Sequence, residues 1–487
     1  MNPAETGATW AIWLIVSPLA AALIAFLLPR VAAGIALVNA VFMTAAALAL
    51  LDQVTEAPQC CALGGWGAPL GIDLYADTLS GVLLVVTSVV FLATLLYSRS
   101  YLARTAIGPL FWPISLFLHA ALNALFLSAD VFNLYVTLEL LSLSAVALVA
   151  LADETRAVAA ALRYLLASIV ASLAYLLGVA LLYHATGVLD LAALAERVTW
   201  TPTTWAALGL MTAGLALKGA LFPVHFWLPG AHSYAPSPVS ALLSALVVKA
   251  PFYVLLRLWY APFVGAPEVV ANLLGLLGAV AIIWGSVQAL RQERLKLLIA
   301  YSTVAQIGYL FLLFPLAQTR SALQGVTVFI VGHALAKAAM FLAAGNIYQY
   351  LGHDRIHDLR RVARELPVTL AAFAVGGVCI IGLPPSGNFI GKWLLIEAAF
   401  EQGDWGWAVI IVAGGLLSAA YIFRVLGHAF TLDKKRAEGT GARATMAWTA
   451  FGLALLALML GLAAAPLIDI IGSPVAVAVA IAAVPAQ

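Results

Sequence analysis

The sequence predicts an all-α polytopic membrane protein with about 14 transmembrane helices. Hydrophobic residues make up 64% of its 487 residues, charged residues make up only 9%, and the mean hydropathy is +1.03. Apolar runs of roughly 20 residues, the length that crosses a bilayer as a helix, recur along the chain. The runs show no alternation of polar and apolar residues, which excludes a β-barrel. The backbone must satisfy its own hydrogen bonds in hydrocarbon, so we expect each run to be helical.

Charged residues and Gly/Pro-rich breaks divide the apolar sequence into fourteen predicted spans. These spans cover residues 9–28, 31–51, 74–98, 107–129, 130–152, 160–184, 204–228, 236–260, 268–290, 294–316, 321–350, 367–399, 405–430 and 446–471. A short surface helix is predicted at residues 190–198. The first run, from about Thr9, follows no basic segment, so we expect it to be a span and not a cleavable signal peptide.

The basic residues predict the orientation of the spans. Sixteen of the 24 Lys and Arg residues, Lys296 among them, fall in loops after odd-numbered spans, whereas three, including Arg257, fall on the other side. Because basic loops are retained in the cytoplasm, both termini are expected outside a cell (inner) membrane. The net charge of +2 provides no basic surface for nucleic acid.

Charged residues inside the spans are the strongest indication of function. The five remaining basic residues are Lys218, Lys249, Lys337, Lys392 and Arg424. Glu139 is the deeply placed carboxylate. Each charge at mid-bilayer costs roughly 2.5–3.5 kcal/mol on insertion scales, so several of them in separate helices indicate function. The alternative is that each is a snorkelling side chain or half of a static ion pair.

The chemistry of lysine favours a proton-conducting function. A desolvated lysine can gain and lose a proton near neutral pH, whereas arginine stays charged, so Arg424 is expected to be a fixed charge. His333 and Lys337 in VGHALAKAAMF lie four residues apart, on one face of a helix. A lone histidine on such a face is more often a packed core residue, but the lysine one turn away favours a proton relay.

Two predicted spans contain helix breakers close to a lysine. In span 7, ALKGALFPVHFWLPGAH, Pro223 follows Lys218; in span 12, IIGLPPSGNFIGKW, Pro384 and Pro385 precede Lys392. Interrupted helices tolerate free backbone groups only beside protein or a wet cavity, and paired interruptions are typical of inverted repeats. The breaks are five spans apart, an odd shift that inverts the topology. A simple kink at each proline is the alternative.

Four other sets of residues carry weaker predictions. His225 and His232 follow the break in span 7 and are expected to anchor a loop or act as a gate. Asp130 begins span 5, as a helix N-cap or a gating residue. The loop residues at 353–358, HDRIHD, are expected to form a solvated cytoplasmic surface and not a metal site. Cys60 and Cys61 are expected in a loop.

The sequence contains no pattern for a bound cofactor. Nucleotide-binding, haem-attachment and iron–sulfur motifs do not occur in it. We therefore expect no cofactor, no metal and no enzymatic activity in this chain.

The motifs together resemble a known family. The run LALKGALFPVHFWLPGAHSYAPSPVSALLSALVVKAPFYVLLRL is similar to the proton-translocating antiporter-like subunits of complex I, membrane-bound hydrogenases and Mrp-type cation/proton antiporters. Similar stretches are DVFNLYVTLELLSLS, LKLLIAYSTVAQIGYL, GHALAKAAMFLAAGNI and GLPPSGNFIGKWLL, so the resemblance covers residues from about 70 to 430. Length and the GGWGAPLGIDLYADTLSG segment are most similar to the D-type membrane protein of Mrp antiporters. The long lateral C-terminal helix of some family members is missing.

The resemblance implies roles for individual residues. Glu139 and Lys218 match the family's glutamate of span 5 and lysine of span 7. Lys249 matches its central lysine of span 8, and Lys392 its lysine of span 12. The span 11 relay is matched by two further residues, Lys337 and His333.

The resemblance and the paired breaks also imply a division of the chain. The parts expected are three N-terminal helices at 1–106, two inverted five-helix repeats at 107–260 and 261–430, and a C-terminal helix at 431–487. Each repeat would supply a half-channel, and a midplane row of lysines would join the two.

Three functions follow as hypotheses. The chain is expected to be a subunit of a multisubunit Na⁺/H⁺ antiporter, working with other membrane subunits, protons and Na⁺ in a lipid bilayer. The alternative is a proton-pumping subunit of a redox complex, either an NADH:quinone oxidoreductase or a membrane-bound hydrogenase. The third is an assembly subunit that transports nothing, against which the intact Glu139, Lys218, Lys249 and Lys392 argue.

Overall fold

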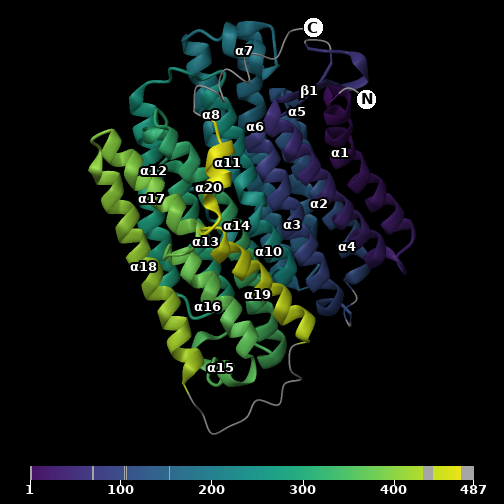
Figure 1. The fold of residues 1–487 in the computed structure, drawn as a ribbon, viewed down its shortest axis with the longest axis vertical. Helices are drawn as coiled ribbons and strands as arrows, with labels where there is room; N and C mark the ends of the chain where they lie inside the picture. Colours follow the sequence, from purple (N-terminus) through teal and green to yellow (C-terminus); the bar gives the residue numbers. More distant parts are fainter. Residues whose placement is uncertain are drawn as a thin grey trace.

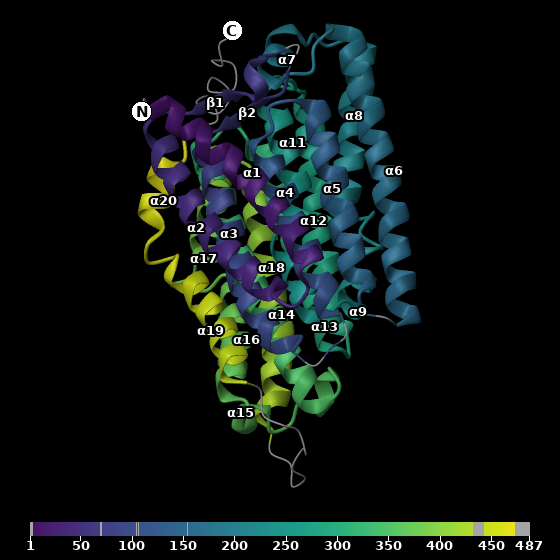
Figure 2. The same cartoon turned by 90° about the vertical axis from the view of Figure 1, so that its right-hand side faces the viewer.

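The structure is a computed structural model that describes residues 3–68, 71–103, 105, 107–152, 154–431 and 443–472, with side chains from Thr9 onward. Long helices packed side by side form its body (Figures 1 and 2). The first part contains α1 (Pro3–Leu27), α2 (Ala32–Glu56), β1 (Gln59–Ala62), η1 (Leu63–Gly65), β2 (Asp73–Ala76), α3 (Thr78–Tyr101), α4 (Gly108–Leu127), α5 (Val131–Ala150) and α6 (Thr155–Thr186).

Short and broken helices occupy the next part of the chain. They are α7 (Leu191–Arg197), α8 (Pro202–Lys218), α9 (Leu228–Tyr234), α10 (Ser237–Ala245), η2 (Val247–Lys249) and α11 (Ala250–Tyr260). The surface helix predicted at 190–198 is confirmed as α7.

The remaining part returns to long helices. It contains α12 (Glu268–Arg291), α13 (Leu295–Phe311), η3 (Phe314–Leu316), α14 (Arg320–Leu351), η4 (Ile356–Asp358), α15 (Val362–Glu365), α16 (Pro367–Ile381), α17 (Gly387–Glu401), α18 (Trp405–Phe430), α19 (Ala444–Met459) and α20 (Ala464–Ile470).

The helical membrane fold is confirmed. Eleven helices of the described chain are long and apolar enough to cross a membrane, or twelve if α19 and α20, bent by 66°, form one span. The predicted spans 7 and 12 account for the difference from fourteen, because the chain there divides into helices of at most 17 residues. The division into two inverted repeats stays a prediction.

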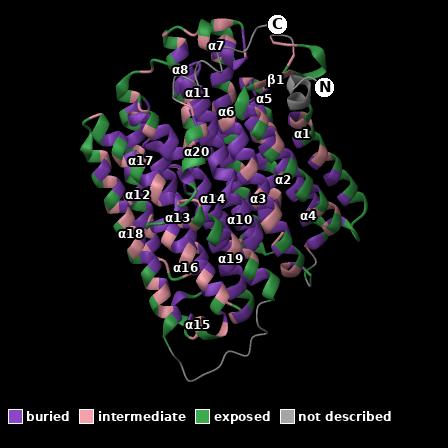
Figure 3. Cartoon of the chain, in the orientation of Figure 1, coloured by how far each residue is buried: buried purple, intermediate pink, exposed green. Residues whose placement is uncertain are grey.

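Burial separates a central set of helices from an outer set. Every residue of α14 from Ala322 to Ile347 is buried, and α14 packs against α3, α10, α13, α16, α17 and α19. Outer helices such as α12 and α18 carry many exposed residues (Figure 3). Large apolar side chains such as Leu166 of α6 and Leu416 of α18 are among the exposed ones. An apolar exterior around a core that contains charged groups is the arrangement expected in a bilayer.

The two ends of the bundle differ in their connections. A hairpin formed by β1 and β2, together with α7, lies at one end, here called the hairpin face (Figure 1). The prediction of an all-helical chain missed this hairpin. At the other end, here called the opposite face, Leu295 donates its backbone N–H to the carbonyl of Asp354, at the start of α13.

A third broken span was not predicted. The sequence predicts one continuous helix over 236–260, but α10 ends at Ala245 and α11 begins at Ala250, with the turn η2 between them. Pro251 at the start of α11 lacks a backbone N–H and cannot complete the hydrogen-bond ladder of a continuous helix. Lys249 is the last residue of this turn.

Candidate functional site

A buried ion pair joins α5, α6 and the end of α8. The Nζ atom of Lys218 lies 3.2 Å from Oε1 of Glu139 and donates to the hydroxyls of Ser142 and Ser168 at 2.7 and 2.8 Å. Ser172 donates its hydroxyl to the same carboxylate. The side chain of Glu139 keeps 26% of its surface exposed, whereas that of Lys218 keeps 4%. Glu139 therefore lies toward the edge of the bundle and Lys218 inside it.

The broken end of α8 is closed by aromatic packing. The indole N–H of Trp227 donates to the carbonyl of Leu217 at 2.9 Å, and its ring stacks on Tyr164 at 4.1 Å. Pro223 lies in the turn between α8 and α9. A Cβ atom on Gly219 would lie 3.7 Å from the carbonyl oxygen of Val248, so the break after Lys218 is packed against the break that holds Lys249.

Lys249 lies in the turn between α10 and α11. It is almost completely buried and donates from Nζ to the carbonyl of Ser244 at 2.6 Å. The hydroxyl of Ser244 in turn lies 2.8 Å from that of Thr303 on α13. The break in span 8 thus places the amine of Lys249 next to the last turn of α10.

The next pair of groups comes from α14. Lys337 is fully buried and donates to the carbonyl of Ile299 at 3.0 Å and to the hydroxyl of Ser302. The ring of His333 stacks on Phe329 at 5.8 Å, and neither of its nitrogens has a hydrogen-bond partner among the described residues. His333 lies one helical turn before Lys337 on α14.

Lys392 lies beside the break between α16 and α17, where Pro384 and Pro385 form the turn. Its Nζ atom donates to the carbonyls of Ile380 and Ile381 at 3.1 and 3.0 Å and lies 4.3 Å from the centre of the Tyr309 ring. It also lines a cavity of about 370 Å³ between α17 and α18.

The two histidines of the broken span 7 are separated by the structure. His225 lies in the turn after Pro223 and packs against Phe222 at 5.7 Å. His232, expected near a loop, is instead fully buried in α9 and stacks on Phe341 at 4.9 Å. The reason is that α9 turns inward from the break, toward α13 and α14. Both ring nitrogens of His232 lack a protein partner in the described chain.

Two predicted supporting residues lie at the ends of helices. Asp130 is the N-cap of α5 and accepts from the backbone N–H groups of Phe132 and Asn133 at 2.8 and 2.7 Å. Burial raises the pKa of Asp130, and the nearby carboxylates of Asp190 and Asp73 raise it further. Arg424 donates to the carbonyl of Leu290, in the last turn of α12.

One loop differs from its prediction. The residues at 353–358 were expected to be solvated, but Asp354 is buried and accepts from Nε of Arg294 at 2.9 Å. This ion pair connects the loop to the start of α13. Among the described residues, no group of three or more histidine, cysteine or acidic side chains forms a metal site.

Sequence reasoning missed two buried cations, Arg257 and Lys296. Arg257 makes a two-fold ion pair with Asp77, with both N–O distances at 2.6 Å, and its Nε donates to the hydroxyl of Tyr253. Lys296 is buried and donates to the carbonyl of Ala235. Both lie within a turn or two of the end of a helix, so they were counted as loop residues. Asp77, the residue directly before α3, was the signal for a partner of Arg257.

The site as a whole is a chain of protonatable groups inside the membrane-spanning region. It begins with the pair of Glu139 and Lys218 and continues through the packed helix breaks to Lys249. His333 and Lys337 follow on α14, and Lys392 lies on α17, which packs against α14. Amines, an imidazole and a carboxylate exchange protons, so such a chain has the chemistry of a proton path.

This fold and this row of charges define a class of membrane subunit. The chain belongs to the family described as NADH:quinone oxidoreductase/Mrp antiporter, TM, which matches residues 128–419. It is therefore an antiporter-like membrane subunit of the kind found in Mrp and complex I-like assemblies.

Two curated relatives and one solved structure show where the similarity lies. The N subunit of NADH-quinone oxidoreductase from Desulforudis audaxviator (strain MP104C) is 38% identical over 449 residues, which cover 89% of this chain and 88% of the relative. The D subunit of the Na(+)/H(+) antiporter from Bacillus subtilis (strain 168) is 29% identical, with 84% of each chain covered. A chain of the Mrp complex from Dietzia sp. DQ12-45-1b has the same fold, with a TM-score of 0.88 at 23% identity; the match covers 99% of this chain and 100% of that one.

Proposed function

We propose that this chain conducts protons across the membrane as one subunit of a multisubunit complex. The observation that carries the proposal is the row of buried lysines, Lys218, Lys249, Lys337 and Lys392, which lie at the end of α8, in the turn before α11, on α14 and on α17. Buried amines are costly in a membrane protein, and a row of them from separate helices supplies successive proton sites.

The ion pair at one end of the row supplies a switch. While the Glu139 carboxylate is 3.2 Å from Lys218, it stabilises the ammonium form. If the carboxylate moves away, the ammonium loses its counter-charge, and repulsion favours passage of its proton toward Lys249. Protons then reach Lys392 by way of Lys337 and His333.

Two kinds of complex fit such a subunit. The Na⁺/H⁺ antiporter that the sequence predicts is supported by the similarity to the antiporter protein of Bacillus subtilis. A redox-driven complex is supported by the similarity to the quinone oxidoreductase protein of Desulforudis audaxviator, and the higher identity of 38% favours it. In both, this chain moves protons while partner subunits supply the driving reaction or the cation path.

The experiment is to purify the native complex and to identify its subunits by mass spectrometry. Iron–sulfur or flavin subunits would assign the redox complex, and small membrane subunits alone would assign the antiporter. Proton flux is then measured in vesicles, driven by the electron donor or by a Na⁺ gradient. Glu139→Ala and Lys249→Ala are expected to abolish coupled flux, whereas Arg364→Gln, at an exposed site, keeps it. Near-normal flux from both site variants would refute proton conduction along this row.

We also propose that the hairpin face lies outside the cell and the opposite face in the cytoplasm. The support is the concentration of basic residues in loops of the opposite face, including Arg294, Arg355 and Arg364.

A further inference from the structure

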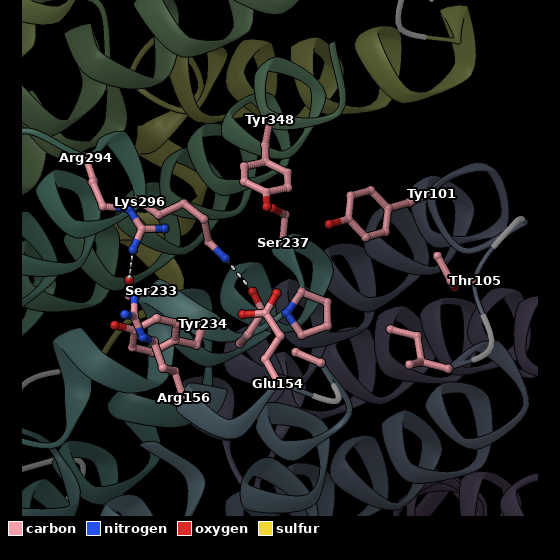
Figure 4. A pocket seen from close by; sticks show the side chains of 14 residues that line it. Tyr101, Thr105, Glu154, Arg156, Ser233, Tyr234, Ser237, Arg294, Lys296 and Tyr348 are labelled. Atoms are coloured by element: carbon pink, nitrogen blue, oxygen red, sulfur yellow. Dashed lines mark hydrogen bonds between the residues drawn. The ribbon is translucent and has the colours of Figure 1, made fainter. Parts of the chain in front are cut away.

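A polar cavity of about 390 Å³ opens at the opposite face, outside the row described above (Figure 4). It lies beside the junction of α9 and α10, near the ends of α3 and α14 and the starts of α4, α6 and α13. Its polar side chains include Thr105, Glu154, Ser233, Arg294 and Lys296. Charged groups of both signs therefore surround a space that is large enough for several water molecules.

Lys296 lies between this cavity and the protein interior. Its side chain lines the cavity, yet only 5% of the residue is exposed. Its amine donates to the carbonyl of Ala235, the residue that ends α9 (Figure 4). The last carbonyls of a helix lack partners within the helix and carry partial negative charge, so they hold an ammonium well.

The same kind of contact holds two lysines of the row. Lys249 is bound by the carbonyl of Ser244 at the end of α10, and Lys392 by the carbonyls of Ile380 and Ile381 at the end of α16. Lys296 thus resembles these two lysines in its burial and in its acceptor.

A histidine connects Lys296 with the row. His232 lies three residues before Ala235 and is fully buried, and neither of its ring nitrogens has a protein partner among the described residues. Its ring stacks on Phe341 of α14, one helical turn after Lys337, and the end of its own helix binds Lys296. An imidazole with two free nitrogens between the α9 end that binds Lys296 and the turn of α14 that follows Lys337 is placed to accept a proton from one side and to release it to the other.

We propose that this cavity is the aqueous port of the proton row at the opposite face, with Lys296 as its first proton site and His232 as the link to Lys249 and Lys337. The proposal rests on the proposed function and adds to it two residues, Lys296 and His232, and the point at which protons enter from water. A proton from cavity water binds the neutral amine of Lys296, and the ammonium passes it to an imidazole nitrogen of His232. The imidazolium returns to neutral when Lys249 or Lys337 accepts the proton. No electrons are exchanged.

The charges around Lys296 favour loading from the cavity. Asp354 accepts the backbone N–H of Lys296 at 3.3 Å, and Arg294 and Glu154 line the same cavity. Arg294 is bound by Asp354 at 2.9 Å and by the hydroxyl of Ser233 at 3.0 Å, so it is fixed beside the cavity. Glu154 is exposed on the cavity wall and attracts protons toward the amine.

The first test removes the proton site. In the assembled complex in vesicles, Lys296→Gln is expected to lower proton flux by at least about tenfold, comparable with Lys249→Ala. Lys296→Arg keeps a donor for the carbonyl of Ala235 but cannot release its proton, so it is expected to be equally inactive. Arg364→Gln is the control for loss of one basic side chain at the same face.

The outcomes separate the two proposals. If Lys249→Ala abolishes flux while Lys296→Gln transports normally, the port is refuted and the row stands. Normal flux from both variants refutes both. Full activity of Lys296→Arg shows that Lys296 only anchors Ala235, and this also refutes the port.

The second test does not depend on the folding of a lysine variant. Thr105→Cys, at an exposed position on the cavity wall, is made in a chain whose Cys60, Cys61 and Cys379 are replaced by alanine. A charged, membrane-impermeant methanethiosulfonate added to the opposite face is expected to label it and to lower its flux at least about fivefold relative to the same vesicles before treatment. Thr431→Cys, exposed at the end of α18, is expected to be labelled without loss. Absence of labelling at Thr105→Cys, or complete labelling without loss of flux, would overturn the proposal.

Discussion

Among single residues, the ion pair of Arg257 and Asp77 shows how this protein tolerates a buried arginine. The guanidinium also packs over the ring of Tyr253 at 4.9 Å, and Ser80 donates its backbone N–H to the same carboxylate at 2.9 Å. Burial by itself would raise the pKa of Asp77, but Arg257 and Ser80 hold it below its usual range. The stabilisation is therefore fully present above about pH 4, the ordinary aspartate value, and is lost only as the pH falls through the lower folded value.

Removal of one partner of this pair is expected to lower the free energy of unfolding. Arg257→Met leaves the carboxylate of Asp77 buried without a cation, which typically costs about 3–5 kcal/mol. Glu365→Gln removes one partner of the partly exposed pair with Arg361, at 3.2 Å, and is expected to cost less than about 1 kcal/mol. Thermal unfolding of the two variants in detergent at pH 7 measures the difference. Equal melting temperatures would show that the buried pair contributes nothing.

Residue chemistry identified four of the buried lysines from the sequence and missed two buried cations near the ends of spans. The four were identified because a charged lysine in the middle of an apolar run costs free energy that the fold alone does not require. These are Lys218, Lys249, Lys337 and Lys392. Lys296 and Arg257 lie nearer to predicted span ends, where a basic residue is ordinary. Burial of such a residue depends on loops from distant parts of the chain, and no local pattern encodes that.

At the scale of elements, the broken helices create the acceptors that the lysines use. Breaks at the ends of α10 and α16 free carbonyls that bind Lys249 and Lys392. The sequence predicted breaks in spans 7 and 12 from their prolines. It missed the break in span 8, although Pro251 follows Lys249 closely, because the apolar run there is uninterrupted.

The packing of α14 against α17 is expected to control the position of Lys392. A Cβ atom on Gly391 would lie 2.8 Å from the carbonyl oxygen of Gly325 and 2.9 Å from the backbone nitrogen of Phe329. Gly391→Ala therefore forces the two helices apart, at a cost of about 1–3 kcal/mol, and moves Lys392 with α17.

The matched control for that variant is Gly209→Ala in α8, where no atom lies within 4 Å of the added methyl group. It is expected to stabilise the protein by up to about 1 kcal/mol, because alanine favours a helix. Melting temperature and proton flux are measured for both. Unchanged stability and flux in Gly391→Ala would contradict the tight packing of these helices.

At the scale of the whole molecule, the sequence predicts the class of fold better than it predicts where helices break and where the hairpin forms. Continuous apolar runs give the helices with little ambiguity, since the bilayer fixes their length. Where the chain breaks inside the bundle, or pairs as the hairpin of β1 and β2, the structure depends on contacts between remote segments. Leu74 of β2, for example, is bridged to Ser128 at the end of α4.

Labelling of Cys60, which lies on the hairpin face, is expected to report the orientation of the whole chain in the membrane. Burial, followed by the carboxylates of Asp73 and Asp190, raises the pKa of Cys60 to about 11. Only the thiolate form of the cysteine reacts, and a raised pKa makes this form scarce at pH 7. Labelling by an impermeant methanethiosulfonate should therefore be slow at pH 7 and should accelerate about tenfold per pH unit up to pH 9. This labelling is expected in right-side-out vesicles only.

Cys60→Ala with Cys61 retained, and the reverse variant, assign the label to one thiol. Preferential labelling in inside-out vesicles would reverse the orientation, and a rate that does not change with pH would contradict the raised pKa.

The order of these contacts along the chain has a consequence for biogenesis. Lys218 is bound by Glu139, Ser142 and Ser168, all of which are synthesised before it. The same holds for the protein acceptors of the other buried lysines, which are Ser244 for Lys249, Ala235 for Lys296, Ile299 and Ser302 for Lys337, and Ile380 and Ile381 for Lys392. As the ribosome delivers the chain to the membrane from its N-terminus, each ammonium group arrives after its acceptors. No lysine of the row therefore enters the membrane before its acceptors have been translated.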